Sequence, residues 1–359
     1  MATVLASCAV LIDMQLRGGG NPLSLVTPAR EGPSVAVFAA DFPDTELPGG
    51  IGHDGQQFYA IARAPMHLQE VASHLDRPYY RLQHPLLSWL AWLLHPQGGG
   101  TGLIFALFAV QVLAMLGGGV ALGALSVSLG GPVWLAAAFP LLPGALSSAR
   151  ITGADSLACA LAIAALAFAV RSRWVPAIVL AVLAVFAKEA VLLLLVGFAL
   201  WRRTRLDVAL VAVPAAIAAA WAVFLRIELS ASGGQVREFV FPFRGLWESA
   251  AEWTHGHEVF AAATLLASLA AAVYGLRRYG LSSPWSWAVV VELAFTAVLG
   301  FDVIGLNFNG TRTTMPLQLA VLLLLTTPVR GPASTHRPNT TPPASSDLGS
   351  DPQRTRSGR

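Results

Sequence analysis

Long apolar runs alternate with short polar segments along most of the chain, which is the pattern of a helical membrane protein. A membrane-spanning helix needs about 20 mainly apolar residues, whereas the shorter, tryptophan-rich stretch His84–Pro96 is typical of an interfacial or re-entrant helix. Apolarity and arginine placement together predict about ten spans. We place them at Ala2–Leu16, Thr101–Leu125, Pro132–Leu146, Ser156–Val170, Trp174–Ala187, Ala190–Trp201, Val208–Leu225, Val259–Leu276, Pro284–Ile304 and Met315–Val329.

The segment between Arg173 and Arg203 decides how the chain crosses the membrane. As one helix it would carry Lys188 and Glu189 at the bilayer centre, with arginine-rich flanks on opposite sides. A lysine or arginine at that depth costs about 2.5–3.5 kcal/mol on insertion scales. Two short helices that turn at Lys188–Glu189 avoid this cost and return both flanks to one side. The sequence therefore predicts two helices here.

The arginines also predict which side each loop occupies. Arginine-bearing segments at 171–173, 201–205 and 277–280 are expected in the cytoplasm, because positive residues concentrate on that side. The remaining connections then face outwards, and most of the unusual polar residues lie in them. These outer segments are the long first extracytoplasmic loop 17–83 and the segments 148–155, 188–189, 226–258 and 307–314.

Composition supports the membrane assignment and argues against a nucleic-acid partner. The 359 residues are 55% hydrophobic and 12% charged, about half the charged content of soluble domains. The net charge is +3, but the arginines separate apolar runs instead of forming one basic face, so we expect no nucleic-acid partner. We expect residues 1–328 to form one polytopic domain of the cell membrane. Residues 329–359 are rich in Pro, Ser and Thr and are expected to be a disordered cytoplasmic tail.

One motif in the first loop carries a family resemblance. The segment "HDGQQFYAIARAP" (His53–Pro65), followed by "RPYYRLQHPLLSWLAWLL" (Arg77–Leu94), resembles the first-loop signature of bacterial GT-C-type glycosyltransferases. Three further segments are similar to later parts of that family. They are "TGADSLACALAIAALA" (Thr152–Ala167), "FAKEAVLLLL" (Phe186–Leu195) and "TRTTMPLQLAVLLLL" (Thr311–Leu325).

The resemblance implies a polytopic enzyme with its active site outside the cytoplasm. Such enzymes transfer a sugar, here expected to be of the mannose or arabinose class, from a polyprenyl-phosphate donor to a glycan or lipid hydroxyl. The transfer is expected to invert the anomeric carbon. The acceptor hydroxyl must lose a proton to a base, and the departing lipid phosphate must be stabilised by cations or hydrogen-bond donors.

The resemblance and this chemistry together nominate site residues. Asp54 is expected to be the catalytic base. Arginine forks match phosphate oxygens and lysine supplies a compact charge, so the phosphate candidates are Arg81, Arg150, Lys188 and Arg312. Gln56, Gln57 and Tyr59 are expected to bind sugar hydroxyls, and Asp155 and Glu189 complete the expected substrate-binding set.

Each assignment has a structural alternative. Asp54 precedes a glycine and could serve only as a turn residue. Asp155 stands where a helix N-cap is favoured, and Lys188–Glu189 could pair with each other at the turn. Arg81 and Arg312 could be interfacial anchors.

No metal or other cofactor is expected, and two other functions compete. The "HGH" segment (His255–His257) lacks a third ligand at usable spacing. A transporter or lipid flippase would favour internal repeats and charges in mid-membrane. A non-catalytic envelope-assembly protein is the other alternative. The gathering of charges at one predicted face favours the glycosyltransferase.

Overall fold

The computed structural model describes residues 1–229, 239–254, 256–305 and 309–327, and these residues are mostly helical. Their β pairing is limited to one antiparallel bridge between Phe239 and Leu299. The predicted all-α class is thereby confirmed. The expected tail, 329–359, and His255 of the "HGH" segment lie outside the described residues.

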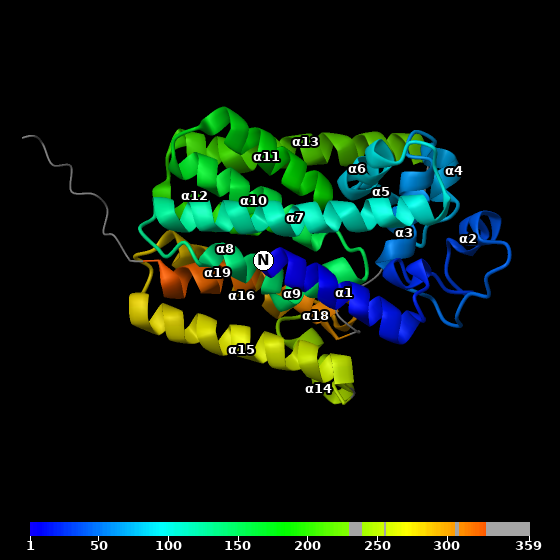
Figure 1. Cartoon of the computed structure of the whole chain (residues 1–359). Helices are drawn as coiled ribbons and strands as arrows, with labels where there is room; N and C mark the ends of the chain where they lie inside the picture. Colours follow the sequence, from blue (N-terminus) through cyan, green and yellow to red (C-terminus); the bar gives the residue numbers. More distant parts are fainter. Residues whose placement is uncertain (230–238, 255, 306–308, 328–359) are drawn as a thin grey trace, which may run out of the picture. The chain divides into compact units, whose positions relative to one another are not determined.

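Apolar helices form the body of the structure, and Figure 1 shows most of them running side by side. They are α1 (Ala2–Gly18), α7 (Gly100–Ser128), α10 (Asp155–Val170), α11 (Trp174–Ala187), α12 (Leu192–Arg202), α13 (Arg205–Leu229), α15 (Gly256–Tyr279), α16 (Pro284–Val298) and α19 (Met315–Thr326). The shorter helices are η1 (Pro22–Leu25), α2 (Val35–Asp41), α3 (Asp54–Arg63), α4 (Leu68–Ala72), α5 (Pro78–Leu82), α6 (Leu86–Leu94), α8 (Leu135–Ala138), η2 (Phe139–Leu141), α9 (Pro143–Arg150), η3 (Glu189–Val191), α14 (Arg244–Glu252), α17 (Phe301–Ile304) and α18 (Asn309–Thr313).

Three helices of the described chain are long and apolar enough to cross a bilayer unaided. They are α7, α13 and the stretch Glu258–Tyr279 of α15, with mean hydropathies of 2.2, 2.4 and 2.0. Four shorter apolar helices, α10, α11, α16 and α19, accompany them. The fold is thus that of a helical protein suited to a membrane.

The chain reverses at Lys188, as the sequence predicts. Helix α11 ends at Ala187, Lys188 is extended, and a 3-10 turn leads into α12. The guanidinium of Arg202 at the end of α12 lies 5.5 Å from the ring centre of Trp174 at the start of α11. In one continuous helix these residues would be about 40 Å apart. Two short helices therefore replace the single long one.

Two predicted spans are not continuous helices. Instead of one span over Pro132–Leu146, the chain forms α8, η2 and the start of α9, because Pro140 and Pro143 fall within it. The predicted span Pro284–Ile304 ends early: α16 stops at Val298, Leu299 and Gly300 are extended, and α17 begins afresh. These corrections matter because the second break lies beside the site described below.

Small residues allow the helices of the body to approach closely. Helix α7 packs on α10, α10 on α11, and α12 on α16. A Cβ atom on Gly197 of α12 would overlap the backbone of Ala288 in α16. Close backbone approach through small residues is how membrane helices gain packing energy without a hydrophobic driving force. Gly197 and Ala288 therefore set how closely α12 approaches α16.

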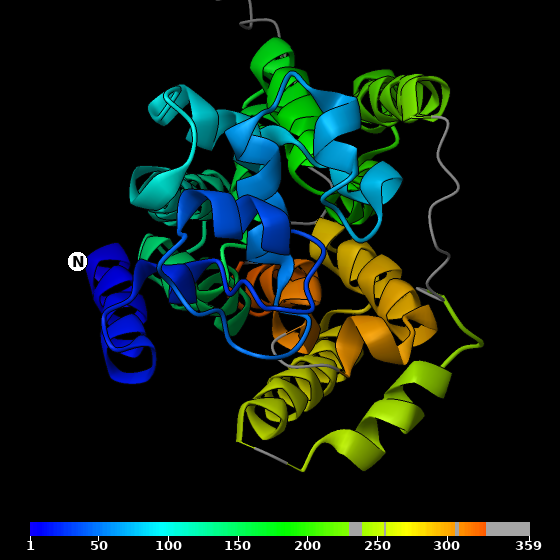
Figure 2. The same ribbon diagram turned by 90° about the vertical axis from the view of Figure 1, so that its right-hand side faces the viewer.

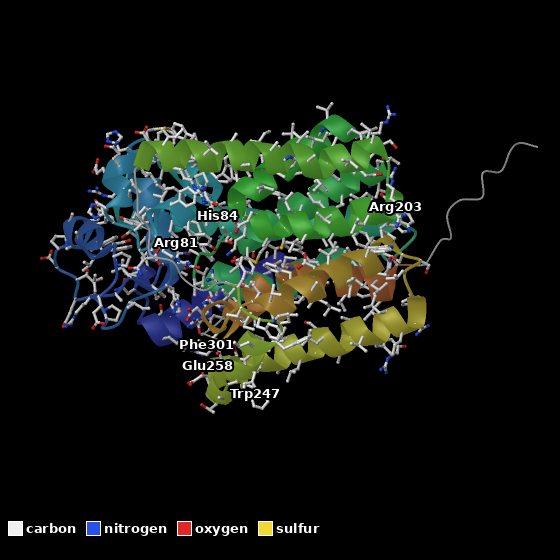
Figure 3. The ribbon with its side chains drawn as sticks, turned by 180° about the vertical axis from the view of Figure 1, so that it is seen from behind. Arg81, His84, Arg203, Trp247, Glu258 and Phe301 are labelled. Carbon is white, nitrogen blue, oxygen red and sulfur yellow. The ribbon has the colours of Figure 1, made fainter. Side chains whose placement is uncertain are left out.

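The two ends of the body differ in chemistry. Figure 3 shows Arg203 at one end and Arg81 and His84 at the other. At the Arg203 end, Arg171 donates from Nε to Ser128 Oγ at the close of α7. The opposite end carries the first-loop helices α2 to α6, onto which Figure 2 looks directly.

The first-loop helices are held to the body by specific hydrogen bonds. Ser88 Oγ of α6 donates to the carbonyl of Phe58 in α3 at 2.8 Å. The Tyr59 hydroxyl donates to Asp41 Oδ2 at 2.7 Å and accepts from the Gly100 amide at 2.6 Å. Because α3 is tied to α2, α6 and α7 in this way, its first residue is held in a fixed position.

Candidate active site

Asp54 begins α3, and glycines on both sides place it there. Gly52 has φ +72°, in the left-handed region that favours glycine. A Cβ atom on Gly55 would lie 2.5 Å from the carbonyl oxygen of Ile151, so only glycine lets the start of α3 touch the loop before α10. Asp54 and Gly55 thus begin a helix instead of forming a turn, and the close approach at Gly55 brings Asp54 against the end of the helical body.

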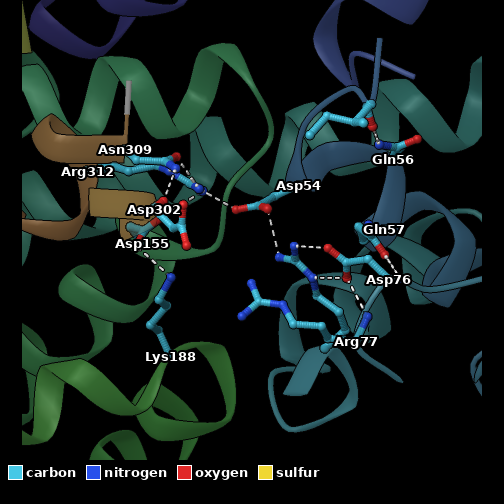
Figure 4. Close-up of polar contacts among 12 residues, drawn as sticks. Asp54, Gln56, Gln57, Asp76, Arg77, Asp155, Lys188, Asp302, Asn309 and Arg312 are labelled. Atoms are coloured by element: carbon cyan, nitrogen blue, oxygen red, sulfur yellow. Dashed lines mark hydrogen bonds and ion pairs between the residues drawn. The ribbon is translucent and has the colours of Figure 1, made fainter. Parts of the chain in front are cut away.

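Both carboxylate oxygens of Asp54 are held by arginines (Figure 4). Arg81 donates from Nη1 to Asp54 Oδ1 at 2.7 Å, and Arg312 donates from Nη2 to Asp54 Oδ2. The side chain of Asp54 is 18% exposed, that of Arg81 11% and that of Arg312 7%. Asp54 therefore bridges two guanidiniums from opposite parts of the sequence in a partly dry setting.

Arg81 is fixed by a second acid. Its Nε and Nη2 bind the two oxygens of Asp76 at 2.9 and 2.8 Å. This fork-to-fork pairing sets the plane of the guanidinium as well as its position. Arg81 therefore serves the interior of the site, and its interactions are not those of a side chain anchored at a membrane surface.

Arg312 joins a second buried acid, Asp155, to the same network. Arg312 Nη1 lies 3.4 Å from Asp155 Oδ2, and Lys188 Nζ lies 3.3 Å from Asp155 Oδ1. The side-chain oxygen of Asn309 accepts from Arg312 at 2.7 Å. Asp155 is the first residue of α10 and makes no capping hydrogen bond. The N-cap interpretation was therefore wrong, because the carboxylate is directed to the two cations.

Lys188 and Glu189 also have separate partners. Lys188 pairs with Asp155, whereas Glu189 contacts Nε2 of the buried His84. The alternative in which the two residues pair with each other at the turn is not what the structure shows. Each charge of the turn instead connects to a different segment of the site.

These contacts set the protonation of the groups. Burial alone would raise the pKa of the Asp54 carboxyl, but Arg312 and Arg81 outweigh it and hold the pKa well below its usual range. Burial would lower the pKa of Lys188, yet the charge of Asp155 raises it. Burial would also raise the pKa of the Glu189 carboxyl, but His84 lowers it to about 2. The network is therefore fully ionised at neutral pH.

A cavity of about 430 Å³ opens onto this network, within the size range of ligand pockets. One part of its wall is charged and includes five predicted site residues. Another part is apolar and comes from the turn after α11, the end of α16 and the segment around Phe239. The lining residues are Asp54, Arg77, Tyr80, Arg81, Lys188, Glu189, Ala190, Leu192, Leu193, Phe239, Phe295, Leu299, Asp302, Val303, Asn309, Arg312 and Thr313.

Five predicted binding residues lie outside the cavity lining, and of these only Asp155 belongs to the charged network around Asp54. The other four make contacts elsewhere. Gln56 donates to the carbonyl of Ile51, and Gln57 accepts from the Asp76 amide. Tyr59 is fully buried in its bonds to Asp41 and Gly100. Arg150 donates from Nε to Asp13 Oδ2 at 2.7 Å. The contacts of these four side chains hold the first loop and α1 in place.

Five polar residues of the cavity lining were not predicted from the sequence: Arg77, Tyr80, Asp302, Asn309 and Thr313. Asp302 and Asn309 come from α17 and α18, and Tyr80 precedes Arg81 in α5. Tyr80 could have been found, because the quoted "RPYYR" segment contains it. Asp302 could not, since it fell near the end of a predicted apolar span.

In the described part of the chain, no group of three or more His, Cys, Asp or Glu side chains is arranged to hold a metal ion.

Comparison of the chain with protein-family models, with curated proteins and with solved structures finds no match.

Proposed function

We propose that this protein is a membrane glycosyltransferase of the GT-C type that moves a sugar, of the mannose or arabinose class, from a polyprenyl-phosphate donor to an extracytoplasmic hydroxyl. The observation that carries the proposal is the composition of one cavity. It combines the Asp54 carboxylate, cationic side chains that include Arg81, Lys188 and Arg312, and an apolar wall. A lipid-linked sugar phosphate needs all three, because it has an apolar chain, a phosphate and a reacting sugar carbon.

The cations are suited to the donor phosphate. Arg81 and Arg312 present guanidinium forks, and Lys188 adds a compact charge. In a site shielded from water, such charges stabilise the phosphate as it departs and gains negative charge. The apolar residues Leu192 and Leu193 line the same cavity and suit the first isoprene units of the lipid.

Asp54 is the proposed base, and its two arginines explain how it becomes active. Held in this way at both oxygens by guanidiniums, the carboxylate is a poor proton acceptor. A bound phosphate competes for the same guanidiniums and weakens their hold on Asp54. Donor binding would thus raise the basicity of Asp54 just when a base is needed.

The proposed transfer step is an inverting displacement at the anomeric carbon. The acceptor hydroxyl oxygen attacks the anomeric carbon, and the bond from that carbon to the phosphate oxygen breaks. The bonding electrons leave with the polyprenyl phosphate, whose charge the cations stabilise. The hydroxyl proton passes to Asp54.

The proposed orientation follows from the two ends of the body. The end that carries Arg171 and Arg203 would face the cytoplasm, since positive residues concentrate there. The cavity and the first loop would then face outwards, at the outer surface of the cell membrane. A polyprenyl donor can present its head group at that surface.

A transport function has one observation in its favour. Glu292 of α16 is 1% exposed, and its Oε1 has no hydrogen-bond partner within the described chain. Ionisable groups inside membrane segments often mark transport pathways. Against this, six charged side chains joined by ion pairs gather at one end of the body: Asp54, Asp76, Arg81, Asp155, Lys188 and Arg312.

A transfer assay tests the proposal. Purified protein in lipid nanodiscs would be supplied with undecaprenyl-phosphate mannose, decaprenyl-phosphate arabinose or undecaprenyl-phosphate glucose, and with mannose- and arabinose-based acceptors. We expect glycosidic product from one donor and none from Asp54→Asn. Movement of the donor between leaflets, without product from any donor, would instead support a flippase.

A further inference from the structure

Asp302 is an acid of the cavity wall to which the proposed mechanism gives no role. It lies in the short helix α17, directly after the break at Leu299–Gly300. Figure 4 shows it beside Asn309, whose side-chain amide donates to the Asp302 carbonyl at 3.3 Å. The backbone of Asp302 is therefore tied to the helix that carries Arg312.

Packing contacts with α14 set the position of α17. Helix α14 packs against α17. A Cβ atom on Gly245 of α14 would overlap the carbonyl of Leu299, so the two segments are in backbone contact. The placement of Asp302 is thus set by packing on one side and by Asn309 on the other.

Its carboxylate differs from the two other acids of the cavity. Asp54 is held by two arginines, and Glu189 by His84. The carboxylate of Asp302 is exposed and has no ion pair or hydrogen bond to the described chain. Arg312 is near in sequence and lines the same cavity, yet its donors go to Asp54, Asp155 and Asn309.

An unpaired carboxylate in this cavity has a defined chemical preference. It only accepts hydrogen bonds, and its negative charge repels a phosphate. It therefore does not suit the donor phosphate, which the three cations already serve. Among the described residues, Asp302 belongs to no group of three or more His, Cys, Asp or Glu side chains that could hold a metal ion.

We propose that Asp302 binds sugar hydroxyls in the cavity, by accepting hydrogen bonds from one or two of them. This inference rests on the proposed glycosyltransferase function and adds a recognition residue to it. The hydroxyls could belong to the sugar of the donor or to the acceptor, since both offer the same chemistry. Asp302 acts by positioning a ring, and the proton of the reacting hydroxyl goes to Asp54.

The test compares lipid phosphates with and without a sugar. Binding of undecaprenyl phosphate and of undecaprenyl-phosphate mannose and decaprenyl-phosphate arabinose would be measured for the wild type, Asp302→Asn and Asp302→Glu in nanodiscs. The matched control is Asp44→Asn, because Asp44 is an exposed first-loop acid outside the cavity lining. Acceptor KM and kcat would be measured beside these affinities.

Removing a hydrogen bond to a charged group is expected to weaken binding by about tenfold or more. If Asp302 holds the donor sugar, Asp302→Asn should weaken binding of the sugar-bearing lipid by that factor. Bare undecaprenyl phosphate should bind at least as tightly as it does to the wild type. If it holds the acceptor, KM for the acceptor should rise by that factor with kcat nearly unchanged. Either outcome supports the proposal, and Asp302→Glu should recover part of the loss.

Other results overturn it. Wild-type affinities and KM in Asp302→Asn would show that no hydroxyl binds there. A loss of kcat of about 10²–10⁴-fold with unchanged KM would make Asp302 the base instead. Retained binding of bare undecaprenyl phosphate shows that a variant is folded. A wild type that prefers the sugar-bearing lipid but never transfers the sugar would overturn the glycosyltransferase and leave the sugar site standing.

Discussion

The substitution Asp54→Asn should move phosphate affinity and turnover in opposite directions. Each arginine bond to Asp54 is a hydrogen bond between charged groups, worth about 1.5–3 kcal/mol. A phosphate that takes over one of these guanidiniums must replace such a bond. Asparagine does not hold a guanidinium as firmly, so bare undecaprenyl phosphate should bind about 10- to 100-fold more tightly.

Turnover should fall in the same variant. Asparagine cannot accept a proton at neutral pH, and a positioned base contributes about 10²–10⁴-fold. The fold should survive, because Arg81 keeps both bonds to Asp76 and Arg312 keeps Asp155 and Asn309. A buried charge left with no partner costs about 3–5 kcal/mol, and neither arginine is left so.

The assay pairs equilibrium binding of undecaprenyl phosphate with single-turnover sugar transfer in nanodiscs. Asp44→Asn serves as the control, since it removes an exposed first-loop carboxylate that lines no part of the cavity. Unchanged or weaker phosphate binding in Asp54→Asn would refute the competition between phosphate and carboxylate. Turnover within threefold of wild type would refute the role of Asp54 as base.

Three further predictions follow from the same structure. The native pKa of Asp54 lies below the value of about 3.9 in an unfolded chain. Its ion pairs therefore add stability above about pH 4, and this stability is lost as pH falls through the lower native pKa. The Tm difference between wild type and Asp54→Asn should shrink from pH 7 to pH 3. Gly197→Ala should lower Tm by overlap with α16, whereas Gly117→Ala, with open space around it, should not. A reporter fused after Arg203 should report the cytoplasm and one at Asp44 the outside; the reverse would contradict the proposed orientation.

The sequence predicted the helical class and the turn at Lys188 because both follow from one energetic rule. Charged side chains avoid the bilayer centre, so a charged pair inside a long apolar run marks a turn. Arg202 and Trp174 in contact confirm it. The same rule did not locate the break after Val298, because residues 299–301 carry no charge and Asp302 stood only two residues before the end of the predicted span. Asp302 was missed for this reason.

The misplaced binding residues have a geometric cause. Gln56, Gln57 and Tyr59 follow Asp54 closely in the sequence, and were grouped with it on that basis. A helix turns by about 100° per residue, so neighbours in α3 point in different directions. Asp54 faces the cavity, whereas the other three face the loop packing and the body. Helical periodicity, applied within the motif, would have separated Gln56 and Tyr59 from Asp54, but not Gln57, because residues three apart lie on the same face of a helix.

The position of the charges at helix ends bears on the kind of substrate. Asp155 opens α10 and Lys188 follows the last residue of α11, so each charge meets the favourable end of a helix dipole. Short helices thereby hold both charges at one end of the body without placing either in mid-bilayer. The apolar Leu192 and Leu193 follow Lys188 within one turn and line the same cavity. A water-soluble sugar nucleotide would leave that apolar wall unused, whereas a sugar phosphate on a lipid chain would contact both parts. The amphiphilic wall therefore favours a lipid-linked donor over a soluble one.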